Sequence, residues 1–352
     1  MSHAEPSRRW SGLCPGGTTV GLYQLRSIFG STIDSESLQE IESQITEIVR
    51  RAGQLALEHF RLPLQVEFKQ ENRSDPVTQA DRAVEEFLRT SITGRFTGHA
   101  ILGEEGTEID VERHDFLWVL DPVDGTNNFM NGLPLFGCSA GLLYRGEPVV
   151  GAIFLPVAPC AAVERVASDG SRSLQLGGAV LHARLGGGTF MDDDPVRASG
   201  DPKPEPSSLV GLPGHHSHQF QRSGGLRQNP GELRSLGSIC YETGMVACGV
   251  FRYAVFRRPR LWDVAAGVSI VREAGGAVLR WNGTGWEALT CFEPMRPRGK
   301  PGEASMRHWT GTVLMGGSEA ASFVAERLRP GSGLFSRIGE GISSLVSGGR
   351  RQ

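Results

Sequence analysis

The sequence predicts a layered α/β sandwich, because helical and strand patterns alternate along most of the 352 residues. Apolar residues make up 39% of the chain and charged residues 21%, a balance typical of a globular protein rather than a disordered one. A β-meander pattern in the first half distinguishes the fold from a simple series of βαβ units. We therefore expect two halves, divided near residue 190.

The first half is expected to begin after residue 33, because residues 1–33 show no apolar period and resemble a flexible arm. A long helix with regularly spaced apolar residues then begins near Asp34. A second helix begins at Thr78, with Asp81 as the acidic partner of a box-like cap. Strands are expected over residues 100–102, 116–120, 137–144, 149–155 and 161–167.

The second half is expected to begin with an irregular stretch over residues 191–234, rich in Pro, Gly, Asp and His. Apolar spacing then predicts helices around residue 245, over 264–271 and from Ser318 to Pro330, with strands over 251–256, 277–281 and 311–315. The expected organisation is an arm (1–33), an N-terminal half (34–190) with the main site, a C-terminal half (191–330) and an extension (331–352).

The clearest chemical signal is the run Asp121-Pro122-Val123-Asp124-Gly125-Thr126 after a buried strand. Asp121 and Asp124 are three residues apart, so one turn can aim both carboxylates at a common point. Two close carboxylates stay ionised most readily with a cation between them, and oxygen ligands favour Mg²⁺ or Mn²⁺ over zinc. The same run is also compatible with an ordinary surface turn, where Asp-Gly pairs are common.

Further signals lie next to this run or in other parts of the chain. The backbone after Gly125 can bind phosphate oxygens, and a metal beside an anion cradle suits phosphoryl transfer. Glu104 and Glu105 end a neighbouring strand, although paired Glu residues usually lie on solvated faces. Asp263 begins a helix, either as its cap or as a third metal carboxylate.

These segments together resemble the inositol monophosphatase family, a branch of the lithium-sensitive, Mg²⁺-dependent phosphatases. The matching residues are Gly103–Gly106, Asp121–Thr126 with Asn128 and Phe129, Trp262–Gly267, Glu273–Gly276, Asp75–Thr78 with Asp81, Lys69, and Ala183–Phe190. The resemblance covers about residues 36–328. It implies an α-β-α-β-α sandwich of the sugar phosphatase type, and usually a homodimer.

The resemblance also implies a ligand set for two or three Mg²⁺ ions, with Mn²⁺ as a substitute. Glu104, Asp121 and the carbonyl of Val123 would bind the first ion. Asp121, Asp124 and Asp263 would bind the second ion. Glu104 would also help to hold a weaker third ion through water.

The catalytic residues implied by the resemblance are Asp81, Glu104 and Thr126. Thr126 and Asp81 would orient and deprotonate a metal-activated water, and the backbone of Gly125 and Thr126 would hold the phosphate. Such a mechanism needs no protein nucleophile, in agreement with the lack of a Ser-His-Asp or reactive Cys signature in the sequence.

The substrate side departs from the inositol-specific pattern. Where those members have a carboxylate seven residues before the helix Asp, this chain has Phe256, followed by Arg257 and Arg258. We expect Gly237, Arg257 and Arg258 to bind substrate with the backbone of Gly125 and Thr126. Phe256 offers a stacking face, and either Arg offers a grip for a second phosphate or carboxylate, unless both point to solvent.

The predicted function is a phosphomonoesterase acting on a small inositol, sugar or polyol phosphate, with a preference for a substrate more anionic than inositol monophosphate. The alternatives are fructose-1,6-bisphosphatase, histidinol-phosphatase and 3′(2′),5′-bisphosphate nucleotidase activity. An alternative of another class is a non-catalytic regulatory member of the fold. Retention of all the matching carboxylates argues against that last alternative.

Composition narrows the range of partners. A net charge of −3 offers no electrostatic case for a nucleic acid polymer, and no apolar stretch approaches the length of a membrane span. We expect a cytoplasmic enzyme whose partners are a small phosphorylated metabolite and a second copy of itself. The histidines over 215–218 are interpreted as an exposed loop that could border the substrate pocket, rather than as a zinc site.

Overall fold

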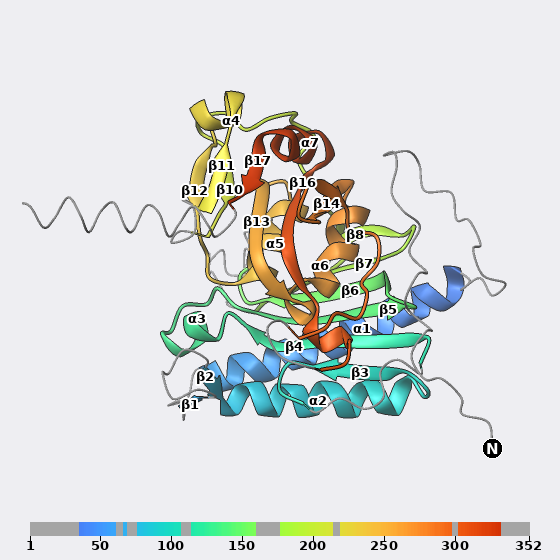
Figure 1. Cartoon of the computed structure of the whole chain (residues 1–352). Helices are drawn as coiled ribbons and strands as arrows, with labels where there is room; N and C mark the ends of the chain where they lie inside the picture. Colours follow the sequence, from blue (N-terminus) through green and yellow to red (C-terminus); the bar gives the residue numbers. More distant parts are fainter. Residues whose placement is uncertain are drawn as a thin grey trace, which may run out of the picture.

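The computed structural model describes residues 35–60, 66–68, 76–106, 114–159, 177–213, 219–297 and 302–331. Two large β-sheets and the helices between and outside them form five layers (Figure 1). The order α-β-α-β-α confirms the predicted sandwich. The loop interpreted over 215–218, the strand expected over 161–167, Lys69, Asp75, the arm over 1–33 and the extension beyond residue 331 lie outside the described residues.

The first sheet has seven strands in the order β3-β4-β5-β6-β7-β8-β9. They are β3 (Ala100–Gly103), β4 (Phe116–Asp124), β5 (Gly137–Tyr144), β6 (Glu147–Leu155), β7 (Ala179–Arg184), β8 (Gly188–Met191) and β9 (Asp194–Pro195). Only β3 and β4 pair in parallel, so these two strands end at the same edge of the sheet.

β4 continues past the point where the sequence predicted its end. Pro122 does not stop the strand; the pairing of β4 with β5 shifts register between Asp121 and Asp124 instead. Such a bulge lets Pro122, which has no N–H to donate, lie within a strand. The bulge also turns the two aspartates that flank it away from a strictly alternating pattern.

Alternation along β4 explains why helices cover both faces of the first sheet. Trp118 and Leu120 pack with the helices of one face, whereas Leu117 and Val119 belong to the core on the other face. The helices are α1 (Ser35–Phe60) and α2 (Gln79–Arg95) on the first face, and α5 (Ile239–Ala247) and α6 (Leu261–Glu273) on the second.

The second sheet has six strands in the order β12-β10-β13-β16-β14-β15. They are β12 (Glu232–Arg234), β10 (Leu209–Gly211), β13 (Phe251–Arg260), β16 (Thr310–Gly317), β14 (Gly276–Trp281) and β15 (Trp286–Ala288). On β13, Ala254 and Phe256 face α5 and α6, and Tyr253 and Val255 face the outer helices α4 (Gly224–Gln228) and α7 (Ser318–Arg327).

The expectation of an irregular stretch over 191–234 is wrong in part. Besides β9, β10, α4 and β12, this stretch contains β11 (Phe220–Arg222), which pairs with β17 (Leu328–Pro330). β10 and β12 pair in parallel beside β13. Strands of three residues are too short for an alternating pattern to be recognised, and their pairing depends on segments far away in the chain.

The short elements β1 (Val66–Phe68), β2 (Pro76–Thr78), α3 (Thr126–Met130) and η3 (Met306–His308) complete the described set.

α6 lies unusually close to the first sheet because two glycines face it. A Cβ atom on Gly141 would lie 2.6 Å from the backbone N of Ala266, and one on Gly151 would lie 2.3 Å from the carbonyl oxygen of Ala266. Any larger side chain would push α6 outward. This close approach brings the first turn of α6 next to β5, where the Ser139 hydroxyl lies 3.5 Å from the carbonyl oxygen of Trp262.

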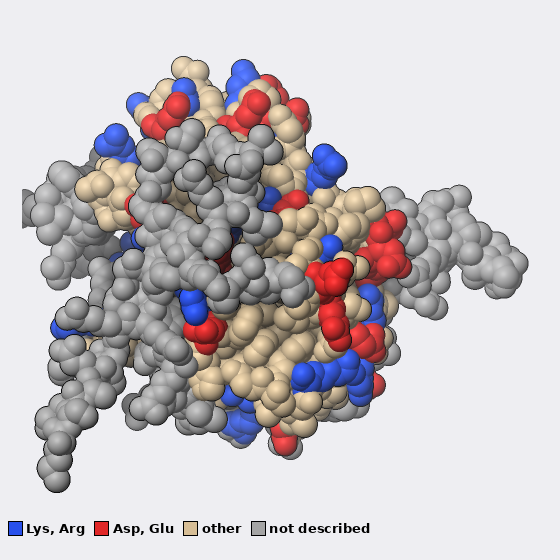
Figure 2. Space-filling model, turned by 90° about the vertical axis from the view of Figure 1, so that its right-hand side faces the viewer, with Lys and Arg blue, Asp and Glu red and all other residues tan. Residues whose placement is uncertain are grey.

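The surface of the described residues mixes charges of both signs. On the face in Figure 2, basic and acidic side chains are interspersed rather than gathered into one basic area. None of the described helices combines the length and the apolar character that a membrane crossing requires.

Candidate active site

Five acidic side chains from separate parts of the chain share one site around the end of β4. Burial raises the pKa of the Asp121 carboxyl well above its usual range, and the charges of Glu104, Asp124, Asp263 and Asp81 raise it further. Asp121 and Asp124 flank the β4 bulge, and Glu104 follows the parallel strand β3. The structure therefore brings together all five predicted acidic residues.

Asp121 lies at the centre of this carboxylate cluster. Only 1% of its surface is exposed, and its Oδ1 atom has no hydrogen-bond partner among the described residues. A buried carboxylate oxygen without a partner is costly, and a cation is the group that best satisfies it. The donor set, all carboxylate oxygens, fits Mg²⁺ or Mn²⁺.

The cluster is open rather than closed. In the described ranges, no three Asp, Glu, His or Cys side chains converge on one point tightly enough to hold an ion. Ion binding would therefore need small side-chain rotations that bring the carboxylates together. A bound cation favours these rotations, because it neutralises the like charges that otherwise repel each other.

Asp124 is tied to the N-terminus of α5. Its Oδ2 atom accepts hydrogen bonds from the Ser238 hydroxyl and from the backbone N–H of Cys240, the latter at 2.7 Å. Burial raises the pKa of Asp124, and these hydrogen bonds act in the opposite direction. Sequence reasoning missed the role of Ser238, although Ser directly before a helix is a common N-cap, and its hydroxyl also accepts from the N–H of Tyr241.

Asp263 lies in the first turn of α6 and belongs to the carboxylate cluster; it is not itself the N-cap residue, and its role as a metal ligand stays a prediction. Arg260 is the N-cap residue, and its backbone N–H donates to Asp263 Oδ2 at 2.7 Å. Burial is the largest cause that raises the pKa of Asp263, and the charge of Asp124 raises it further. Its position three residues into the helix lets the side chain fold back over the helix start.

The turn that carries Glu104 is held by Arg307, a residue that the sequence analysis did not single out. Arg307 Nη2 donates to the carbonyl oxygens of Gly103 at 2.8 Å and Gly106 at 2.5 Å, and Nη1 lies 3.4 Å from the Glu104 carbonyl oxygen. The guanidinium also lies 5.5 Å from the centre of the Trp262 ring. One side chain of the C-terminal half therefore links the segments that carry Glu104 and Asp263.

Asp81 and Thr126 are held by short local hydrogen bonds. The backbone N–H and the hydroxyl of Thr78 donate to Asp81 Oδ2 at 2.8 and 2.5 Å, which confirms the predicted cap. The Thr126 hydroxyl donates to the carbonyl oxygen of Val123 at 3.0 Å. A carbonyl oxygen has two lone pairs, so Val123 can accept this bond and still bind an ion.

The predicted phosphate-binding backbone lies against the start of α5. Gly125 has a φ of 91°, which other residues adopt only with strain, and a Cβ there would lie 3.0 Å from Ser238 Cβ and 3.3 Å from the Gly237 carbonyl oxygen. Asn128 Nδ2 donates to the carbonyl oxygens of Leu135 at 2.7 Å and Leu236 at 2.6 Å. Gly125, Thr126 and Gly237 are therefore neighbours, as the predicted substrate site requires.

The expected stacking face at residue 256 is not present. Phe256 is 3% exposed and packs in the core between the two sheets, because its position on β13 points it toward α5 and α6. Arg257 pairs with Thr312 across to β16, whereas Arg258 is exposed, has a φ of 57° and lines a cavity at the end of β13.

Glu242 is a further buried acid beside the cluster, and it predicts a pH-dependent stability. Burial raises its pKa from the ordinary value of 4.5 to about 7, and the charge of Asp124 adds to this shift, although the Leu236 N–H donates to it at 2.7 Å. The folded state favours the protonated form of Glu242. The contribution of this group to the stability of the folded protein is therefore complete below about pH 4.5 and is lost as the pH rises through about 7.

We therefore expect the free energy of unfolding of the wild type to fall with rising pH more steeply than that of Glu242→Gln. A pKa of about 7 in the folded state against the ordinary 4.5 corresponds to roughly 3 kcal/mol of stability over the whole pH range. Urea unfolding of both proteins in EDTA, from about pH 5 to about pH 8, measures the difference. Parallel curves for the two proteins would show that Glu242 titrates normally.

Comparisons with known proteins show the family to which the chain belongs. The sequence pattern that defines the family described as "Inositol monophosphatase family" matches residues 37–307. "Phosphatase IMPL1, chloroplastic" of Arabidopsis thaliana is 31% identical over 246 residues, which are 68% of this chain and only 62% of that protein. "Histidinol-phosphatase" of Chlorobaculum parvum is 32% identical over 244 residues, 67% of this chain and 84% of that protein.

Two further similarities concern another named phosphatase and a solved structure. "Fructose-1,6-bisphosphatase/inositol-1-monophosphatase" of Thermotoga maritima is 30% identical over 241 residues, 67% of this chain and 83% of that protein. The crystal structure of extragenic suppressor protein suhB from Bartonella henselae superposes with a TM-score of 0.61 at 24% identity, covering 82% of this chain and 97% of that one. This last similarity concerns the fold alone.

Proposed function

Since the chain belongs to the inositol monophosphatase family, we propose that its carboxylate cluster binds Mg²⁺ and hydrolyses the phosphomonoester of a small metabolite. The family and its named relatives support a phosphatase of small phosphorylated metabolites. The single observation that carries the assignment of the site is the buried, partnerless Oδ1 atom of Asp121 among four other carboxylates.

The proposed ion ligands all come from the cluster and the β4 bulge. Glu104, Asp121 and the Val123 carbonyl would hold one ion. Asp121, Asp124 and Asp263 would hold a second ion, and Glu104 would help to hold a weaker third. When bound, Mg²⁺ supplies an acidified water and neutralises the charge of the phosphate.

The protein groups around the ions position the reactants. Asp81 is fixed by two hydrogen bonds from Thr78 through Oδ2, which keeps its carboxylate at the edge of the cluster as a base for the attacking water. The Thr126 hydroxyl, held by Val123, would orient the same water. The backbone N–H groups after Gly125, where α3 begins, would bind the phosphate oxygens.

A bisphosphatase or histidinol-phosphatase activity is the second candidate, because relatives carry those names. We propose Arg257 and Arg258 as contacts for the part of the substrate beyond the scissile phosphate, as a carboxylate is missing there for sugar hydroxyls. A homodimer and a cytoplasmic location stay proposals. A non-catalytic role is disfavoured, because a decayed site would not retain five clustered acids, of which Asp81, Asp121 and Asp124 are buried, at this cost.

The experiment that tests the function is a release assay for inorganic phosphate. The panel contains inositol 1-phosphate, fructose 1,6-bisphosphate, histidinol phosphate and 3′-phosphoadenosine 5′-phosphate, each assayed with Mg²⁺ and again with excess EDTA. We expect Mg²⁺-dependent turnover of at least one substrate. Full activity in EDTA would exclude the proposed metal site, and lack of turnover with the whole panel would exclude the proposed substrates.

Lithium sensitivity is a further expected result of this assignment. The three acids proposed for the second ion, Asp121, Asp124 and Asp263, are all retained, and lithium sensitivity is typical of the family. We expect millimolar LiCl to inhibit turnover at a fixed Mg²⁺ concentration, while equal NaCl does not. Identical LiCl and NaCl curves would remove this claim and leave the phosphatase assignment in place.

A further inference from the structure

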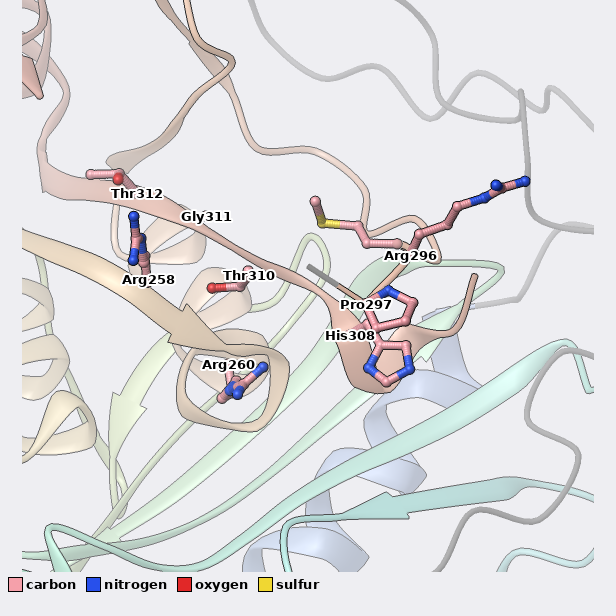
Figure 3. A pocket seen from close by; sticks show the side chains of 9 residues that line it. Arg258, Arg260, Arg296, Pro297, His308, Thr310, Gly311 and Thr312 are labelled. Carbon is pink, nitrogen blue, oxygen red and sulfur yellow. The ribbon is translucent and has the colours of Figure 1, made fainter. Parts of the chain in front are cut away.

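A cavity of about 670 Å³ lies at the end of β13, next to the start of α6 (Figure 3). Its lining residues come from the end of β13, the start of β16 and the segment before β16. They are Arg258, Arg260, Met295, Arg296, Pro297, His308, Thr310, Gly311 and Thr312. We refer to this cavity as the arginine pocket.

The arginine pocket is basic. Three of its nine lining residues are arginines and a fourth is His308, and none of the nine is acidic. Arg258 and Arg296 are exposed, and the structure records no ion pair between either of them and a described residue. The charge of Arg260 acts on Asp263, whereas Arg258 and Arg296 carry positive charges whose mutual repulsion a bound anion would remove. The hydroxyls of Thr310 and Thr312 add neutral hydrogen-bond donors.

The backbone of β13 is distorted at this point. Arg258 has a φ of 57°, in the left-handed region that non-glycine residues rarely adopt. The pairing of β13 with β16 also shifts register between Arg257 and Arg260. Unfavourable backbone of this kind persists where a site needs a particular side-chain direction. Here it presents Arg258 and Arg260 together to the pocket.

Two of the lining residues connect the arginine pocket with the segments that carry Asp263 and Glu104. The Arg260 backbone N–H donates to Asp263 Oδ2 at 2.7 Å, and the Arg260 charge acts on the Asp263 carboxyl. His308 follows Arg307, whose guanidinium holds the turn of Glu104. A small molecule with a phosphate at the cluster would therefore extend past Arg260 into the pocket.

We propose that the arginine pocket binds a second acidic group, a phosphate or a carboxylate, on the substrate whose scissile phosphate lies at the carboxylate cluster. This inference rests on the proposed function and narrows it to small metabolites with two acidic groups. The planar guanidinium matches the oxygens of phosphate and carboxylate with paired hydrogen bonds, so Arg258 and Arg296 select such a group over a hydroxyl.

The test compares a bisphosphorylated with a monophosphorylated sugar in Arg296→Gln and in Arg258→Gln/Arg296→Gln. A charge-assisted hydrogen bond contributes enough binding free energy that each change should lower the specificity ratio about tenfold. This ratio is kcat/KM for the bisphosphorylated sugar divided by kcat/KM for the monophosphorylated one. Arg329→Gln is the matched control, because Arg329 is an exposed arginine on β17, outside the pocket. It should leave the ratio as in the wild type. Arg296 is exposed on a loop, so its variant should fold, and a melting curve verifies this.

Several outcomes would overturn the inference. If the wild type turns over substrates with Mg²⁺ but the Arg variants lower both kcat/KM values equally, the pocket does not select a second acidic group. If added sulfate changes wild-type turnover of the monophosphate through Arg296, the pocket binds a separate anion instead. If the wild type lacks Mg²⁺-dependent turnover altogether, the proposed function fails, and this inference fails with it.

Discussion

Asp121→Asn is expected to lower Mg²⁺-dependent turnover by about a thousandfold or more and, at the same time, to raise the melting temperature of the metal-free protein. Asp121 is proposed to contact two ions, whose loss removes several kcal/mol of transition-state stabilisation. In the absence of metal, its buried carboxyl lies among four other acids. A neutral amide of the same shape removes that repulsion and the cost of burying a charge.

Phosphate release and thermal melting, each with Mg²⁺ and with EDTA, check both parts of this expectation. The wild type should gain melting temperature when Mg²⁺ is added, because ligands that bind only the folded state stabilise it. Asp121→Asn should gain little. Asp193→Asn, an exposed aspartate outside the cluster, is the control and should behave as the wild type. An active Asp121→Asn protein, or one that responds to Mg²⁺ like the wild type, contradicts the assignment of the site.

Arg307→Ala is expected to lower activity at limiting Mg²⁺ by about 10- to 100-fold, the usual effect of removing a residue that orients a metal ligand. Arg307 contacts no reacting atom in this proposal; it positions the turn of Glu104 through the carbonyl oxygens of Gly103 and Gly106, and it stacks on Trp262. Without it, Glu104 loses its fixed position. More Mg²⁺ should then be needed for half-maximal activity.

A Mg²⁺ titration of turnover separates this positioning role from general destabilisation. The expected change is a higher Mg²⁺ concentration at half-activation, with part of the activity recovered at saturating Mg²⁺. Arg307→Lys should recover little, because an ammonium group cannot reproduce the two-pronged contact with carbonyl oxygens. Arg329→Ala is the control. An unchanged Mg²⁺ dependence in Arg307→Ala, with or without a lower melting temperature, would show that Arg307 is only structural.

Local patterns were sufficient for most of the elements near the site. The Thr78–Asp81 cap, strand β5 and the apolar faces of α1 and α6 depend on residues close together in the chain, and each was predicted from spacing alone. The end of β4 was predicted too early, since a proline normally ends a strand unless a bulge accommodates it. The short strands within 191–234 were missed, because their pairing is decided by distant partners.

The sequence by itself determined which acids are proposed for the site, because their spacing along the chain matches a family and places them at the ends of strands and helices. Only the tertiary structure decided how those acids are held. Ser238 contacts Asp124, 114 positions away, and Arg307 contacts Gly103, 204 positions away. The basic residues around Arg258 also come from separate segments of the chain. Such contacts leave no local period or motif, since they arise from the packing of α6 on Gly141 and Gly151 and from the meeting of the two sheets.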